Sequence, residues 1–458
     1  MARIDARFDT RLDTRRFDTS RFDSSRFDTR VDGRFAHDLP AAEKPVARSL
    51  TTWAEALPGT VIETTKGRHF EMEKLFPRHQ RHGSYEISDL HAMDPNLLEG
   101  ISGGVIQCTD PRRWAFLDTE TTGLAGGSGT CAFLIGLGSI TGDGFLVRQY
   151  FVRDFDEEAS ALEALRQELE RFDVLVTFNG RTFDQPLLET RYTMNRARHP
   201  FARMEHLDLL YGARRLFRLR LESCRLINLE QEILGFERHG DVPGEMIPHL
   251  YFEYLRSGRV ARLGPVFEHN ALDIVSLACL TGIIPEAFRD PCNAKARHGM
   301  DLLGLARWLA MSGRLEEALA LTRRAVDLGL PDAHLFRALF EAGVLEKKLG
   351  RVAESLATFT DLTLSRNPYR ARGYEEVAKY YEHAERNFAM ALEFVRAARA
   401  SGDSAALQAR ELRLGARAER VTKQLRLAPA KKPVRRGFVQ AASSPSPCPR
   451  PVPTLKLN

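Results

Sequence analysis

Apolar and polar positions follow two different periods along the middle of the chain. Three apolar runs, residues 112–119, 131–140 and 144–152, have the length and composition of strands. The last two flank a Thr-Gly-Asp-Gly turn sequence, which predicts a hairpin. Residues 156–172 show a helical pattern that begins with acids, and "DVLVTF" at 173–178 predicts a short buried strand. This order predicts an α/β domain with a mixed sheet covered by helices.

Residues 296–400 are helical in pattern throughout. The related segments "GRLEEAL", "GRVAESL" and "RNFAMAL" begin at Gly313, Gly350 and Arg386, 37 and 36 residues apart. This spacing is similar to that of tetratricopeptide-type helical hairpins, whose period is about 34 residues. The third segment has arginine where the first two have glycine. We expect a stack of such hairpins, and a helical bundle without repeats is the simpler alternative.

Both ends of the chain have compositions that cannot form a core. Residues 1–35 repeat an Arg-Phe-Asp pattern, with nine Arg and seven Asp, whereas residues 429–458 carry six Lys or Arg, no acid and seven prolines. We therefore expect a disordered arm at 1–48 and a disordered basic, proline-rich tail at 426–458. The arm could contact nucleic acid or a partner, but its composition favours an extension without a structural role.

These features divide the chain into four parts. Between the arm and the tail we expect an α/β domain at 49–290, including short lead-in strands such as "TVIET" and "HFEMEKLF", and an all-α repeat domain at 296–425. The net charge of +5 belongs to the ends, because residues 1–35 contribute +2 and residues 429–458 contribute +6, which leaves about −3 for the residues between them. A uniformly basic nucleic-acid-binding protein is therefore not indicated.

The composition indicates a cytoplasmic protein. The chain has no run of about 18 consecutive apolar residues, so we expect no membrane-spanning helix. Its first residues are rich in Arg and Asp and lack the apolar segment of a secretory signal. The six cysteines lie far apart and form no C-x-x-C pair, which argues against a zinc ribbon or disulfide framework and fits a reduced compartment.

Candidate chemistry begins with two acids at the end of the first predicted strand. In "WAFLDTETTG", Asp118 and Glu120 are two residues apart, so both side chains point to the same face of the strand. Two carboxylates that close repel each other unless a positive group lies between them. They are either a solvated strand end or ligands of a hard divalent cation, and this stretch alone leaves both interpretations open.

Two further stretches carry acids inside the same domain. In "LVTFNGRTFDQPLL", a strand ends near Asn179, and Asp184 follows at a predicted helix start, where a single acid often has only a structural role. In "FEHNALDIVSLACL", His269 and Asp273 are four residues apart and share one helix face. Taken alone, His269 is more simply a histidine at the edge of the core.

The three stretches together resemble the DEDD nuclease superfamily of the ribonuclease H-like fold, and more narrowly the YprB-like group. "DTETTGL", "FNGRTFDQPLL" and "HNALDIVSL" are similar to its three motifs in order, and the resemblance covers about residues 60–288. It implies a ribonuclease H-like mixed sheet flanked by helices. It also implies that four carboxylates bind metal and that His269 is the general base; the carboxylates are Asp118, Glu120, Asp184 and Asp273.

One spacing departs from the family pattern. Members with histidine usually place it five positions before the last aspartate, whereas His269 lies four positions before Asp273, as in members with tyrosine there. The role of His269 therefore follows less directly than the roles of the acids.

Independently of the resemblance, hydrolysis of a phosphodiester is well served by two Mg²⁺ or Mn²⁺ ions held by carboxylates. Asn179 could orient the metal ligands without binding the metal itself.

A candidate for backbone binding lies in residues 191–225, which hold nine Arg, three acids and no Lys. Arginine binds phosphate with two parallel hydrogen bonds, so Arg214 and Arg215 are candidate contacts to a nucleic-acid backbone. A solvated helical face explains the same composition equally well.

The sequence therefore predicts a metal-dependent nuclease that acts on DNA or RNA. The resemblance implies a 3′–5′ exonuclease, and we expect single strands as its substrate. Its helical repeats could bind a protein partner. The alternative is a non-catalytic adaptor that binds nucleic acid and scaffolds partners through its repeats, and a phosphoesterase acting on a small substrate is a third class.

Overall fold

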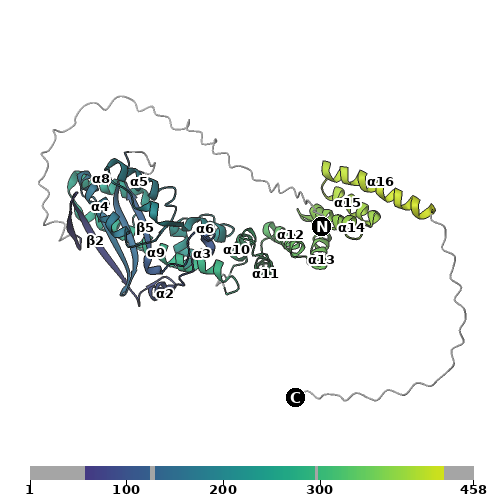
Figure 1. The fold of residues 1–458 in the computed structure, drawn as a ribbon, viewed down its shortest axis with the longest axis horizontal. Coiled ribbons are helices and arrows are strands. Elements are labelled where there is room, and N and C mark those ends of the chain that lie inside the picture. The colour runs from purple at the N-terminus through teal and green to yellow at the C-terminus, as the bar shows by residue number, and fades with distance from the viewer. Residues whose placement is uncertain (1–56, 124–128, 294–297, 428–458) are drawn as a thin grey trace, which may run out of the picture. The chain divides into compact units, whose positions relative to one another are not determined.

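A computed structural model describes residues 57–123, 129–293 and 298–427 (Figure 1). The predicted arm at 1–48 lies outside the described residues. The predicted tail also lies outside them, except that residues 426 and 427 form the end of the last described helix.

The α/β part is built on a seven-stranded sheet with the order β1-β2-β7-β6-β5-β8-β9. The strands are β1 Gly59–Thr64, β2 Gly67–Pro77, β3 Arg81–His82, β4 Tyr85–Glu86, β5 Trp114–Thr121, β6 Ala132–Thr141, β7 Gly144–Phe151, β8 Val174–Thr177 and β9 Glu205–Asp208, of which β3 and β4 pair separately. β5 pairs antiparallel with β6 and parallel with β8, and β8 pairs parallel with β9. The predicted mixed sheet is therefore confirmed, and the lead-in strands β1 and β2 extend it beside β7.

Helices cover both faces of this sheet (Figure 1). In this part of the chain the α-helices are α2 Ile87–His91, α3 Glu99–Ser102, α4 Glu158–Leu169, α5 Asp184–Met194, α6 Leu209–Phe217, α7 Leu226–Leu229, α8 Ile247–Ser257 and α9 Gly264–Arg289. Because side chains alternate along β5, Trp114 and Phe116 pack into the core with α9, whereas Ala115 and Leu117 pack on the opposite face with α4 and α5. This alternation also decides which face the acids at the end of β5 approach.

Helix α9 is the central helix of the larger core. Among the described residues, the stretch Val260–Arg289 is long and apolar enough to cross a membrane by length and composition, but its apolar window is 67% buried inside the protein. It packs against β5, β6 and β7. Its hydropathy is therefore explained by its position in the core.

The described residues after 298 are helical, as the sequence predicts. The helices are α10 Gly299–Met311, α11 Leu315–Asp327, α12 Asp332–Lys348, α13 Val352–Leu364, α14 Arg370–His383, α15 Phe388–Ser401 and α16 Ala405–Leu427. Consecutive helices pack in pairs, α10 with α11, α12 with α13 and α14 with α15. Gly313, Gly350 and Arg386, the first residues of the three related segments, all have left-handed backbone angles, with φ of +80°, +76° and +53°.

The sheet domain and the first helix pair share one core. Trp308 of α10 packs on Phe288 of α9, with ring centroids 4.5 Å apart, and Asp301 pairs with Arg220 at 2.9 Å. At Gly304 the two backbones approach so closely that an added Cβ would lie 2.4 Å from the carbonyl oxygen of Leu216. No side chain larger than hydrogen fits at that position without movement of the backbone.

Candidate active site

The end of strand β5 brings the first two acids to the face covered by α9. Asp118 and Glu120 have the same orientation as the core residues Trp114 and Phe116, because they are separated from them by an even number of residues. Thr119 points to the other face, where its Oγ1 donates a hydrogen bond of 2.6 Å to Oδ1 of Asp184. Adjacent residues of one strand therefore reach motifs on both sides of the sheet.

The second motif follows strand β8, which is parallel to β5 and ends at the same edge of the sheet. Asn179 has a left-handed backbone with φ +69°, and its amide donates to Oδ1 of Asp208 at 2.8 Å. Oδ2 of Asp208 accepts from the amide of Arg181 at 3.2 Å. This turn delivers Asp184 to the first position of α5. The structure thus shows Asn179 acting through its backbone in the turn that precedes Asp184.

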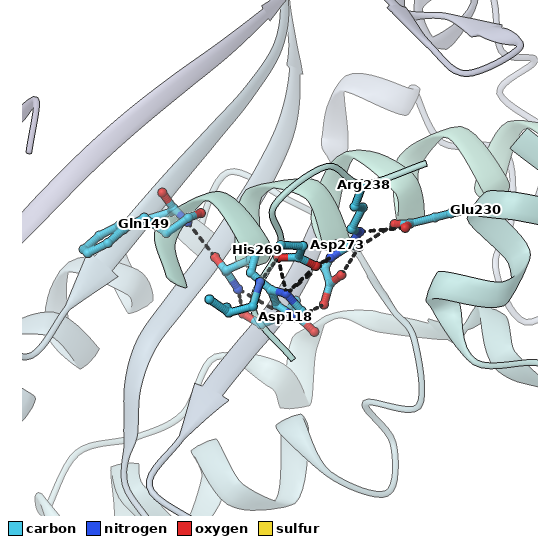
Figure 2. A network of polar contacts seen from close by, with 10 residues as sticks. Asp118, Gln149, Glu230, Arg238, His269 and Asp273 are labelled. Carbon is cyan, nitrogen blue, oxygen red and sulfur yellow. Dashed lines mark hydrogen bonds and ion pairs between the residues drawn. The ribbon is translucent and has the colours of Figure 1, made fainter. Parts of the chain in front are cut away.

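Helix α9 contacts the acids through Asn270. Its Nδ2 donates to Oδ2 of Asp118 at 2.9 Å, and its Oδ1 accepts from Nε2 of Gln149 at 2.9 Å (Figure 2). The close approach of α9 requires glycine in β6, since a Cβ at Gly136 would lie 2.2 Å from Oδ1 of Asn270. Gln149 and Asn270 therefore fix the position of one oxygen of Asp118.

His269 and Asp273 lie on the same face of α9. Nε2 of His269 is 3.6 Å from Oδ2 of Asp273, and its Nδ1 is 2.9 Å from both carboxylate oxygens of Asp241. Arg238 contacts Asp273 through Nη2 and Asp241 through Nη1, the latter at 3.0 Å (Figure 2). The Nε of Arg238 donates to Glu230 at 2.7 Å. A buried ion-pair network thus stands beside the third motif.

Burial and mutual repulsion raise the pKa values of the clustered acids. Burial raises the pKa of Asp118 well above its ordinary value, and the neighbouring carboxylates of Asp273, Glu120 and Asp184 raise it further. Burial, Asp273 and Asp184 do the same to the pKa of Glu120. The pKa of Asp184 is raised to about 6, mainly by burial. Asp273, Glu120 and Asp184 therefore lie close enough to Asp118 to disfavour its charge.

The donor set fits a hard divalent cation. Glu120, His269 and Asp273 each offer one ligand atom within 4.8 Å of the others. Carboxylate oxygens are the ligands that Mg²⁺ and Mn²⁺ prefer, and a cation would offset the repulsion that raises these pKa values. The same geometry leaves two roles for His269, a metal ligand or a proton acceptor beside the metal.

The predicted arginines lie on helix α6, which carries none of the four candidate acids. Arg214 and Arg215 are exposed in the last turn of α6, about 9 Å along the helix from Asp208 at its start. The guanidinium of Arg215 stacks on Trp308 at 5.5 Å, so this side chain is part of the junction with α10.

Sequence reasoning missed Arg238, Asp241 and Glu230. They lie in or beside a segment, residues 235–246, that has neither helical nor strand periodicity and contains two left-handed glycines, Gly235 and Gly240. One signal was present, because "FERHGD" joins Arg, His and Asp within a short turn-rich stretch. Their partners on α9 are distant in the sequence, and no local pattern links the two.

Comparison with known proteins agrees with the fold. Residues 115–284 match a family described as the RNase_H superfamily. YprB of Bacillus subtilis (strain 168), described as an uncharacterized protein, is 30% identical over 346 residues, which are 74% of this chain and 82% of the relative. The chain therefore belongs to the RNase H superfamily and, within it, to the family of YprB. This superfamily has a nuclease-type fold, normally uses divalent metal ions and typically binds nucleic acid.

Proposed function

We propose that this protein is a nuclease that hydrolyses phosphodiester bonds of DNA or RNA with two divalent cations, Mg²⁺ or Mn²⁺. The observation that carries the proposal is a group of carboxylates at one edge of an RNase H-like sheet, where Asp273, Glu120 and Asp184 lie close enough to Asp118 to raise its pKa. The resemblance to DEDD exonucleases supports removal of nucleotides from a 3′ end, with a single strand as the preferred substrate.

The side chains have separate tasks in this mechanism. The four carboxylates would hold the cations, which when bound supply an activated water and neutralise charge on the phosphate. His269 would accept the proton of the attacking water through Nε2, the nitrogen that faces Asp273. Asn270 and Thr119 keep Asp118 and Asp184 in place.

A time course on 3′- and 5′-end-labelled oligonucleotides tests the activity. We expect Mg²⁺- or Mn²⁺-dependent loss of single nucleotides from the 3′ end, with single- and double-stranded DNA and RNA compared in parallel. Asp118→Asn preserves the shape of the side chain but removes a ligand charge, so hydrolysis should nearly vanish. Binding without cleavage by the wild type would support the adaptor instead, and cleavage of small phosphoesters alone would support a small-molecule enzyme.

His269→Ala separates the two roles of the histidine. If His269 is the proton acceptor, Mn²⁺ affinity measured by calorimetry stays close to that of the wild type while turnover falls by about 10²–10⁴-fold. If His269 is a metal ligand, affinity and turnover fall together. Unchanged turnover would leave His269 as a structural residue.

Arg214 is the better of the two arginine candidates for backbone contact. Arg214→Glu should weaken nucleic-acid binding and flatten its dependence on salt, since each phosphate contact releases counterions. Arg218→Glu changes an exposed arginine at the C-cap of the same helix and serves as a control for position. Unchanged salt dependence in Arg214→Glu would remove Arg214 from the binding surface.

A further inference from the structure

We infer that Asp241 is a positioning residue for His269, and that Arg238 holds Asp241 and Asp273 in the arrangement this requires. The inference rests on the proposed function, because it assigns His269 an orientation suited to accepting a proton. It concerns a segment, residues 235–246, that lies outside the three motifs predicted from the sequence.

The contact between Asp241 and His269 defines the orientation of the imidazole ring. Both carboxylate oxygens of Asp241 lie 2.9 Å from Nδ1, and a carboxylate only accepts hydrogen bonds, so Nδ1 carries the hydrogen. Nη1 of Arg238 is 3.4 Å from the same nitrogen, but it is also a donor, and the shorter contact with the carboxylate decides the proton's place. In the neutral form of the ring, Nε2 then keeps its lone pair on the side of Asp273.

The helix alone does not provide this orientation. His269 and Asp273 are four residues apart, so they lie one above the other on α9, and both side chains share one narrow stretch of the site. A half-turn of the imidazole about its Cβ–Cγ bond would place Cδ2 and Cε1 where Nδ1 and Nε2 lie, and both nitrogens would lose their present contacts. Asp241 approaches from outside the helix and favours one of the two orientations.

Arg238 anchors Asp241 to the core. Its side chain is 4% exposed and contacts three carboxylates, Glu230, Asp241 and Asp273. Glu230 is fully buried, so breaking its ion pair with Arg238 would leave a buried charge without a partner and would strongly destabilise the folded protein. Only arginine has the planar fork of donors that can serve these partners together. The position of Asp241 is therefore tied to that of Asp273 through one rigid group.

A double-mutant cycle on the full-length protein tests whether Asp241 acts through His269. Asp241→Ala should lower the rate of Mg²⁺-dependent cleavage about 10-fold to 100-fold, the usual effect of losing the partner that orients a histidine at a metal site. In the His269→Ala background the same substitution should change the rate less than twofold. Glu237→Gln, which removes an exposed charge from the same segment, is the matched control and should cleave like the wild type.

The conservative variant Asp241→Asn distinguishes positioning from general structural support. Asparagine keeps an oxygen that accepts from Nδ1, so this variant should recover most of the rate lost in Asp241→Ala. Thermal unfolding should show that all variants compared are folded. Equal losses in Asp241→Ala with and without His269 would overturn the inference, as would a wild-type rate in Asp241→Ala.

A spectroscopic measurement tests the contact without relying on cleavage. In protein labelled with ¹⁵N-histidine, the signals of His269 are identified by their loss in His269→Ala. At a pH where the ring is neutral, wild type should show hydrogen on Nδ1, and Asp241→Ala should shift the population toward hydrogen on Nε2. An unchanged population would overturn the inference. If the wild type does not cleave nucleic acid, the proposed function fails, but this measurement still shows whether Asp241 orients His269.

Discussion

At the scale of single residues, Asp184 combines deep burial with a nearby donor. Its side chain belongs to a residue that is 7% exposed, and it accepts a hydrogen bond from Thr119. Burial raises its pKa from 3.8 to about 6, against the effect of Thr119 and with a further contribution from Asp208. The protein therefore holds an acid whose protonation changes close to neutral pH.

This shift predicts how the effect of a divalent cation depends on pH. A raised pKa favours the protonated carboxyl in the folded state, so its stabilising contribution is complete below 3.8 and is lost as pH rises through about 6. A bound cation would restore stability mainly above that range. Mn²⁺ should therefore raise the melting temperature more at about pH 7.5 than at about pH 5, as measured by differential scanning fluorimetry.

Asp184→Asn is the control for this pH dependence. The amide does not titrate, so the variant should show a smaller Mn²⁺ effect that varies less between the two pH values. An equal rise of the wild-type melting temperature at both pH values would contradict the assignment of Asp184 as a titrating ligand.

The same scale shows which parts of the site the sequence could indicate. Asp118, Glu120, Asp184 and Asp273 stand in short patterns tied to a strand end or a helix face, and the structure brings these positions together. Arg238 has no such pattern, because two of its three carboxylate partners lie 8 and 35 residues away and are brought to it by the path of a turn-rich segment. Contacts that depend on tertiary structure leave no local periodicity.

At the scale of elements, strand β6 controls how closely α9 approaches the sheet. Gly136 and Gly138 face the helix, and a Cβ at either position would lie within 2.5 Å of Asn270 or Ile274 atoms. The hairpin of β6 and β7 was predicted from the turn sequence, but the purpose of these glycines was not. They let α9 lie close enough to the sheet for Asn270 to contact Asp118 on the same face.

Gly136→Ala should therefore affect both stability and the site. Overpacking of this kind typically costs about 1–3 kcal/mol. We expect a lower melting temperature together with weaker Mn²⁺ binding by calorimetry, because displacement of α9 moves Asp273 away from Glu120. Gly142→Ala, at an open position in the following turn, is the control and should leave metal binding unchanged. Loss of stability with full Mn²⁺ affinity would show that α9 adjusts without moving the third motif.

The paired helices after residue 298 carry a second prediction at this scale. Gly313, Gly350 and Arg386 all have left-handed backbone angles, and a residue with Cβ pays about 1 kcal/mol or more for that conformation. Arg386→Gly should therefore keep or raise the melting temperature, despite the greater freedom of glycine in the unfolded chain. Gly350→Ala should lower it. A clear loss of stability in Arg386→Gly would mean that contacts of the arginine side chain outweigh the backbone strain.

At the scale of the whole molecule, the sheet domain and the first helix pair are joined by a shared core. The sequence indicates a change from α/β to all-α pattern near residue 290, and the described residues follow that change. Periodicity could not reveal that α10 continues the same core through Trp308 and Leu305. A change of pattern shows where the secondary structure changes. It does not show whether the two parts fold independently.

Trp308→Ala should consequently destabilise both parts together. Removal of a buried tryptophan costs about 3–5 kcal/mol, and Trp308 contacts Phe288 of the sheet domain and Arg215 of α6. Calorimetry should show one transition shifted to lower temperature, and a chain ended after residue 290 should be less soluble than the full chain. Tyr374→Ala, in a separate cluster of the later helices, is the control. A transition of the sheet domain that stays at its wild-type temperature in Trp308→Ala would establish two independent domains.

The ion pair between Arg238 and Asp273 has a practical consequence. Arginine keeps its charge at any pH at which the protein is handled, so one of the clustered acids retains a cationic partner even after treatment with a chelator. The protein should then survive storage in EDTA, accept a nucleic acid while inert, and begin the reaction when manganese is added. Such a preparation would let all molecules in a crystal or a rapid-mixing cell start at the same moment.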